Sequence, residues 1–184
     1  MDVENLLTQL KKGNKAVERV IFDLLADRML LLCMRYVKNR EDAEELMLSG
    51  MLKLFRHLPE FKFQFENGFY AWCRRIMVNE CLMHLRKHHS FILAGEPSAD
   101  IIQDNEEIIA RLDAADLFEE ILQLPPGYRT IFNLYAVEGY DHREIAELLT
   151  ISVGTSKSQL SKARALLQKN LVQKGFYHVR KKTI

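Results

Sequence analysis

The stretch that most constrains the fold is 140–167, YDHREIAELLTISVGTSKSQLSKARALL. Asp141 precedes Glu144 by three residues, the spacing of a capping box that starts a helix. Apolar residues then recur at helical spacing at Ile145, Leu148 and Leu149. Thr150 interrupts this pattern, and Ser152 can cap a second helix. The sequence therefore predicts two short helices joined by a tight turn, a helix-turn-helix.

The second of these helices has a narrow apolar edge, made by Leu160, Ala163 and Leu167. Its other positions are small, polar or cationic: Thr155, Lys157, Ser158, Gln159, Ser161, Lys162 and Arg164. No Asp or Glu occurs between Ser152 and Ile184, whereas eight Lys and Arg do. A phosphate-facing surface excludes negative charge, so this helix is predicted to bind duplex DNA. The alternative is an ordinary helical hairpin with a solvated face.

The net charge of +1 hides three blocks of different sign. Residues 1–90 hold 15 Lys and Arg against 12 Asp and Glu, residues 91–126 hold 1 against 9, and residues 127–184 hold 10 against 4. Gly, Pro and Ser accompany the acids of residues 91–106. We therefore expect two domains, 1–90 and 107–172, joined by an acidic linker (91–106) and followed by a basic tail (173–184).

Helical periodicity runs through almost the whole chain, and hairpin signals are missing apart from a strand-like stretch near 61–67. The expected helices are 3–12, 16–37, 42–59, 69–88, 107–124, 126–138, 141–150 and one that begins after Ser152. The predicted fold class is all-α: two small helical domains, of which the C-terminal one is a helix-turn-helix.

The expected helix 69–88 follows an aromatic loop and carries a polar side. Arg75, Asn79 and Arg86 fall within an arc of about 40° on it. We expect its core side to hold Trp72, Ile76 and Met83. Cations beside aromatic rings are typical of surfaces that bind single-stranded nucleic acid. Buried aromatics with solvated arginines are the structural alternative.

Other chemistry has little support in the sequence. Cys81, His84 and His88 share one helical face but do not complete a tetrahedral metal site. The motifs of phosphate loops, dinucleotide folds and serine hydrolases are absent. We therefore expect no cofactor, no metal and no enzymatic activity. Without an export signal or a membrane-spanning run, a cytoplasmic protein is predicted.

Two long stretches together resemble one known family. Residues 124–167 resemble region four, and residues 40–87 region two, of the extracytoplasmic-function class of bacterial RNA polymerase sigma factors. The resemblance implies a subunit that directs core RNA polymerase to promoter DNA and helps to melt it, under the control of an anti-sigma factor, without membrane insertion. A helix-turn-helix regulator with an N-terminal sensing or dimerising domain is the alternative.

The resemblance also implies roles for individual residues. The minus-ten element would be held by Phe65, Asn67, Phe69, Arg75, Asn79 and Arg86. The minus-thirty-five element would be read by Arg143, Thr155, Lys157, Ser158, Gln159, Lys162 and Arg164. Polymerase would be contacted by Asp42, Glu45, Leu46, Leu48 and Ser49.

The chain departs from the family pattern at several positions. Leu48 and Ser49 stand where the family usually has Gln and an acid, and Ser156 where it often has Val. Gln159 replaces a common Arg. Thr150 replaces the usual Gly or Asn of the turn, so a left-handed backbone there would be strained.

Overall fold

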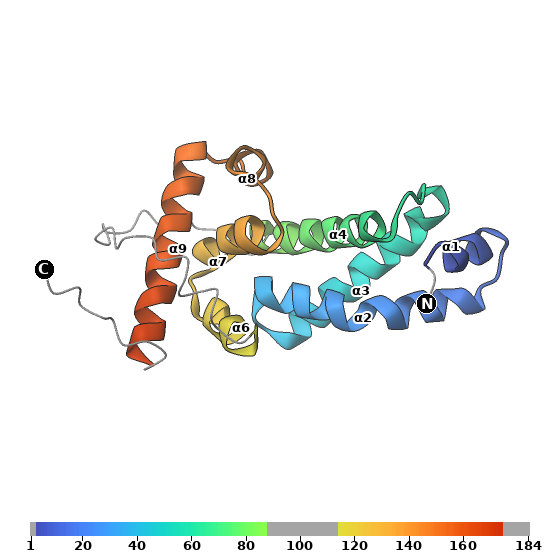
Figure 1. The fold of residues 1–184 in the computed structure, drawn as a ribbon, viewed down its shortest axis with the longest axis horizontal. Coiled ribbons are helices and arrows are strands. Elements are labelled where there is room, and N and C mark those ends of the chain that lie inside the picture. The colour runs from blue at the N-terminus through green and yellow to red at the C-terminus, as the bar shows by residue number, and fades with distance from the viewer. Residues whose placement is uncertain (1–2, 88–113, 175–184) are drawn as a thin grey trace, which may run out of the picture. The chain divides into compact units, whose positions relative to one another are not determined.

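The structure is a computed structural model that describes residues 3–87 and 114–174, and these residues are helical apart from short connections (Figure 1). The chain divides into two compact units, Met1–His89 (unit 1) and Ser90–Ile184 (unit 2). The predicted all-α fold with two helical domains is confirmed. The expected acidic linker, 91–106, lies outside the described residues, as does most of the expected tail.

Unit 1 is built around three mutually packed helices. Its elements are α1 (Val3–Lys11), α2 (Ala16–Val37), α3 (Arg40–His57), the 3₁₀ turn η1 (Leu58–Glu60) and α4 (Glu66–Lys87). Helices α2, α3 and α4 pack against one another, while α1 lies against α2 and η1. Their interface buries apolar side chains from all three helices, among them Leu25, Leu54 and Met77.

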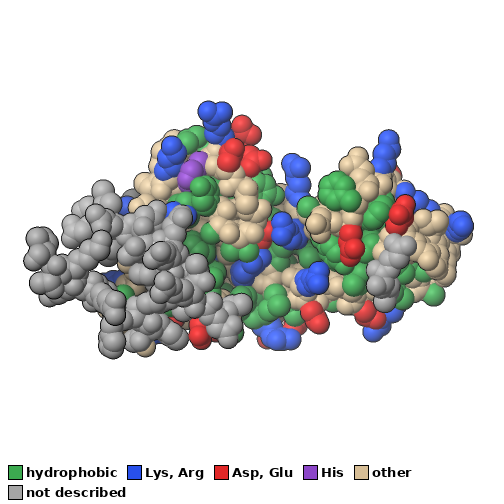
Figure 2. Space-filling model, viewed as in Figure 1, with side chains coloured by type: hydrophobic (Ala, Val, Ile, Leu, Met, Phe, Trp, Pro, Cys, Tyr) green, Lys and Arg blue, Asp and Glu red, His purple; other side chains and the backbone are tan. Residues whose placement is uncertain are grey.

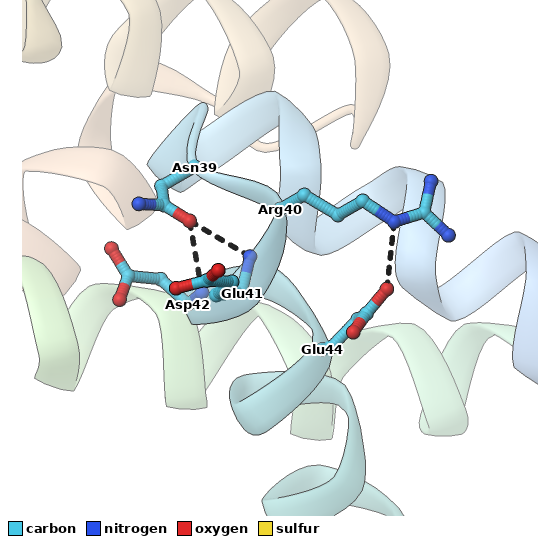
Figure 3. Close-up of polar contacts among 5 residues, drawn as sticks. All are labelled: Asn39, Arg40, Glu41, Asp42 and Glu44. Atoms are coloured by element: carbon cyan, nitrogen blue, oxygen red, sulfur yellow. Dashed lines mark hydrogen bonds and ion pairs between the residues drawn. The ribbon is translucent and has the colours of Figure 1, made fainter.

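Helix α3 begins at Arg40, with Asp42 just inside it, because Asn39 caps its start (Figure 3). The Asn39 side-chain oxygen accepts hydrogen bonds from the backbone N–H groups of Glu41 (2.7 Å) and Asp42 (3.3 Å). These bonds satisfy two of the donors that a helix start leaves unpaired. Arg40 also pairs with Glu44 one turn on, at 2.7 Å, an exposed ion pair that contributes little to stability.

Helices α3 and α4 approach closely and are joined by a buried carboxylate. A Cβ added at Gly50 would lie 2.3 Å from the Met77 sulfur, so any larger residue there would force the Met77 side chain to move. Glu80 of α4 is buried, and its two oxygens face α3. One accepts from Lys53 Nζ at 2.6 Å and the other from Ser49 Oγ at 3.1 Å. These contacts add a polar link to the apolar packing between α3 and α4.

Unit 2 consists of α6 (Ala114–Gln123), α7 (Pro126–Phe132), the π-helical turn η2 (Asn133–Val137), α8 (His142–Leu149) and α9 (Val153–Gln173). Helix α9 packs against α6, α7 and α8. Pro126 starts α7, as its missing N–H and fixed φ favour. The expected continuation to Glu138 is a π turn instead, with Glu138 N donating to Asn133 O at 2.9 Å.

The predicted helix-turn-helix is present in α8 and α9, with both predicted caps. Asp141 accepts from the backbone N–H groups of Arg143 and Glu144, and the Glu144 side chain accepts from Asp141 N in return. The N–H of Glu144 foremost, then that of Arg143, lowers the pKa of Asp141. Ser152 accepts from Thr155 N at 2.9 Å.

Thr150 ends α8 in the left-handed conformation, with φ 56° and ψ 48°. A β-branched residue is strained there, whereas Gly adopts this conformation freely. Thr150→Gly should therefore raise the free energy of unfolding of unit 2 by about 1 kcal/mol. Chemical denaturation of the full chain would measure this change.

Ser161→Gly is the matched control for this substitution. Ser161 is exposed in the interior of α9, where glycine lowers helix stability by about 0.5 kcal/mol. If both glycines destabilised the protein, strain at Thr150 would not be the cause.

Candidate nucleic-acid interface

The core side of α4 differs from the expected one. The structure buries Phe69, Cys73, Met77 and Cys81 completely, one residue per turn. The prediction that Trp72, Ile76 and Met83 form this core was wrong. Trp72 and Ile76 are half-buried, and Met83 is 48% exposed.

The opposite side of α4 therefore combines apolar and polar side chains. At 100° per residue, Arg75, Asn79 and Arg86 share an arc of about 100° with the three residues expected in the core. All three of these polar side chains are exposed. Figure 2 shows Lys and Arg side chains beside hydrophobic ones over the part of the view where α4 runs in Figure 1. This surface, which we call the α4 face, offers an amide, two guanidinium groups and apolar contact area to one ligand.

An aromatic cluster adjoins the start of α4. The Phe61 ring lies 4.6 Å from that of Trp72 and 5.7 Å from that of Phe69, between centroids. Lys11 Nζ of α1 donates to Phe61 O at 2.8 Å and so holds this loop from the other side. Two of the predicted minus-ten residues differ in exposure, because Phe65 is 58% exposed whereas Phe69 is fully buried. Phe69 is thus part of the core, and its assignment to DNA contact stays a prediction that this burial does not favour.

The other member of this loop in the predicted set, Asn67, is exposed in the first turn of α4. Sequence reasoning missed Phe61 and Trp72 as partly exposed rings beside it. Their pairing could not be predicted because the cluster forms only when η1 turns the chain back onto α4.

The two phenylalanines give a matched stability test. Phe69→Ala should lower the free energy of unfolding by about 3–5 kcal/mol, because it leaves a cavity where a fully buried ring stood. Phe65→Ala should change it by less than about 1 kcal/mol, since most of that ring is already in water. Thermal and urea denaturation of both variants would measure the difference. Equal losses would contradict this assignment of the two rings.

The predicted polymerase contacts lie near the start of α3. Glu45 and Leu48 are exposed and Asp42 is partly exposed. Leu46 is buried, so its assignment to polymerase contact stays a prediction that the packing of α3 does not favour. Ser49 is half-buried, and its hydroxyl is bonded to Glu80. Sequence reasoning missed Leu52, which is 69% exposed one turn after Leu48.

Helix α9 buries its predicted stripe, Leu160, Ala163 and Leu167. The other predicted residues are exposed (Arg143, Lys157, Ser158) or partly exposed (Thr155, Lys162, Arg164). Gln159 is the exception, because it is buried and its side-chain oxygen meets no hydrogen-bond partner among the described residues. Its assignment to base reading stays a prediction, which this burial does not favour.

Replacing Gln159 with an apolar residue of similar length should not harm the fold. Gln159→Met removes a buried oxygen without a partner, which costs about 1–3 kcal/mol in other proteins. We expect an unchanged or higher melting temperature and an unchanged preference among DNA sequences. Calorimetry would measure the melting temperature, and binding to a set of duplexes would measure the sequence preference. A narrower or broader preference in the variant would show that Gln159 contributes to base reading.

A contact that sequence reasoning missed joins α8 to α9. His142 Nδ1 lies 2.9 Å from Ser156 Oγ, and Ser156 is fully buried. The His142 ring also stacks on Tyr135, with centroids 4.5 Å apart, and the Arg164 guanidinium lies 5.7 Å from the Tyr135 centroid. Ser156, where the family often has Val, thus has a polar partner in this chain.

Other reactive groups are not brought together in the described part of the chain. Residues 3–87 and 114–174 contain no group of three His, Cys, Asp or Glu side chains that could hold a metal ion. His88 of the weighed Cys81–His84–His88 set lies outside them. Burial raises the pKa of Cys73 to about 12, which keeps its thiol protonated. In the same residues no helix is long and apolar enough to cross a bilayer.

Comparison with known families agrees with this arrangement of two helical units. The family model for sigma-70 region 2 matches residues 21–91, which contain α3 and α4. The family model for sigma-70 region 4 matches residues 115–167, which contain the helix-turn-helix. The chain is a sigma factor of the extracytoplasmic-function class. Proteins of this class are transcription-initiation subunits that bind DNA.

Curated relatives extend the likeness over more than nine-tenths of the chain. The sigma factor is 27% identical to the ECF RNA polymerase sigma factor SigW of Bacillus subtilis, over 93% of this chain and 97% of that protein. It is 28% identical to the RNA polymerase sigma-H factor of Pseudomonas aeruginosa, over 91% and 93%. A chain in the structure of CnrH in complex with the cytosolic domain of CnrY shares the fold, with a TM-score of 0.50 and 21% identity over 91% of this chain and 96% of that one.

Proposed function

We propose that this sigma factor uses unit 1 to bind core RNA polymerase and to hold an unstacked base of the minus-ten element, and unit 2 to read the minus-thirty-five element. The observation that carries the proposal for unit 1 is the α4 face, where Asn79 lies exposed with two arginines and partly exposed apolar side chains. Unstacking a base costs a few kcal/mol, which a surface of this kind can compensate.

Each kind of side chain on the α4 face has its own role in this proposal. Trp72 and Phe65 offer ring surface on which a base can stack. The Asn79 amide can donate to and accept from a base edge. Arg75 and Arg86 neutralise the phosphates on either side of that base, and Asn67 borders the same loop.

Polymerase binding is proposed for the exposed side of α3. Leu48 and Leu52 stand one turn apart and are both exposed, at 50% and 69%. Exposed leucines at this spacing favour contact with a helical or coiled-coil surface of a partner protein over contact with water. Asp42 and Glu45 add negative charge at the start of the same helix.

DNA reading is proposed for the exposed side of α9. Lys157 and Ser158 stand near its start, with Thr155, Lys162 and Arg164 alongside and Arg143 at the start of α8. The lysines neutralise phosphates, while the hydroxyls and Arg164 reach base edges. The described part of α9 has no carboxylate to oppose this binding.

The remaining partners follow from the same proposal. An anti-sigma factor would hold the chain inactive, as is typical of the class. The chain would act in the cytoplasm, bound to polymerase, and would supply no catalytic residue. CnrH, whose fold it shares, was solved with the cytosolic domain of CnrY.

Asn79→Ala tests the role of the α4 face. Because Asn79 is exposed in a helix, the free energy of unfolding should change by less than about 0.5 kcal/mol, and polymerase binding should persist. Run-off transcription from a double-stranded promoter should fall about tenfold, since hydrogen bonds worth over 1 kcal/mol to the unstacked base are lost. A template already mismatched at the minus-ten element should recover part of this loss.

Asn5→Ala is the matched control, an exposed helical asparagine of α1 in the same unit. It should leave transcription from both templates at the wild-type level. Arg75→Ala should reduce transcription from both templates alike, because a phosphate contact is needed whether or not the strands are paired. If Asn79→Ala also reduced both alike, or neither, its amide would not hold the unstacked base.

A further inference from the structure

His142 is a titratable side chain at the junction of α8 and α9. His142 is the first residue of α8, and its ring is partly exposed. Its Nδ1 meets the buried Ser156 hydroxyl at 2.9 Å, and one ring face stacks on Tyr135.

We assign the proton of the neutral ring from the contact with Ser156, in which either atom can be the donor. A buried hydroxyl needs an acceptor, and Nδ1 of a neutral imidazole provides one. The proton of the neutral ring is then on Nε2, at the other edge. Nε2 makes no hydrogen bond to the described residues and is not enclosed by them. Ser156 and Tyr135 thus hold the ring with an N–H directed outward.

The geometry points to His142 as a DNA-backbone contact, with Nε2–H donating to a phosphate oxygen of the strand that Lys157 and Arg164 attract. This inference rests on the proposed reading of DNA by unit 2, and it adds a contact and a property that the proposal lacks. The group that His142 would contact is a phosphodiester. Because the described part of α9 carries no acidic side chain, we assign this phosphodiester to a duplex bound along α9.

The charges around the ring make this contact sensitive to protons. Burial foremost, then Lys157 and Arg164 of α9, lower the pKa of His142, while Asp141 beside it acts in the opposite direction. Tyr135 of η2 completes the ring's surroundings. A phosphate beside Nε2 favours the charged ring and so raises its pKa in the complex. DNA binding therefore takes up a proton at Nδ1, where the Ser156 hydroxyl changes from donor to acceptor. Affinity rises as pH falls through the interval between the two pKa values.

Paired substitutions separate the two ring nitrogens. In His142→Asn the side-chain oxygen can replace Nδ1 as acceptor for Ser156, but no donor replaces Nε2. In His142→Gln the amide NH₂ can replace Nε2, but the Ser156 contact is lost. Affinity of the full chain for a mixed-sequence DNA duplex at low salt would be measured by fluorescence anisotropy between pH 8 and pH 6.

Wild-type affinity should increase as pH falls, by at most tenfold per pH unit because one proton is bound. His142→Asn should abolish this increase, weaken binding about fivefold at pH 6, and reduce the salt slope by about 0.9. His142→Gln should also bind independently of pH but retain more affinity than His142→Asn. His57→Asn, at an exposed histidine of unit 1, should behave as wild type.

The outcomes distinguish this inference from the proposed function. If His142→Asn keeps the wild-type affinity and pH dependence while Lys157→Ala weakens binding, the phosphate contact is refuted and DNA reading by α9 stands. If His142→Gln weakens binding more than His142→Asn, the ring acts only through Ser156, and the inference is refuted. If neither wild type nor Lys157→Ala shows duplex binding, DNA reading by unit 2 fails and this inference with it.

Discussion

The rotation of α4 about its own axis is the constraint on which the rest of unit 1 depends. Burial of Phe69, Cys73, Met77 and Cys81 determines it, at about 1.5–3 kcal/mol for each large apolar side chain. A rotation by one residue would bring these side chains into water and turn Asn79 toward the core. The position of every polar group on the α4 face is therefore a consequence of packing on the other side of the helix.

Local signals in the sequence predicted unit 2 well. Asp141 with Glu144, and Ser152 ahead of α9, act within a few residues, so their hydrogen bonds can be inferred without knowledge of the fold. The same holds for Pro126 at the start of α7. The strained Thr150 also follows from local chemistry, because a turn between two capped helices needs a left-handed residue whichever side chain is present.

Predictions failed where the local sequence does not show which side of a helix packs against the core. Helix α4 carries apolar residues on both sides, so periodicity could not tell the core row from Trp72, Ile76 and Met83. Gln159 is polar and next to exposed positions, yet the packing of α9 turns it inward. The contact of His142 with Ser156 spans fourteen positions and two helices, so no local pattern indicates it.

The buried carboxylate of Glu80 limits how this interface can change during evolution. Its two oxygens accept hydrogen bonds from Lys53 and Ser49. The lysine balances the negative charge of the carboxylate, and the serine supplies a neutral donor. An acid at position 49, as the family pattern has it, would set two carboxylates against a single lysine. A neutral donor at position 49 therefore suits this interface, and an acid there would need a compensating change at Glu80.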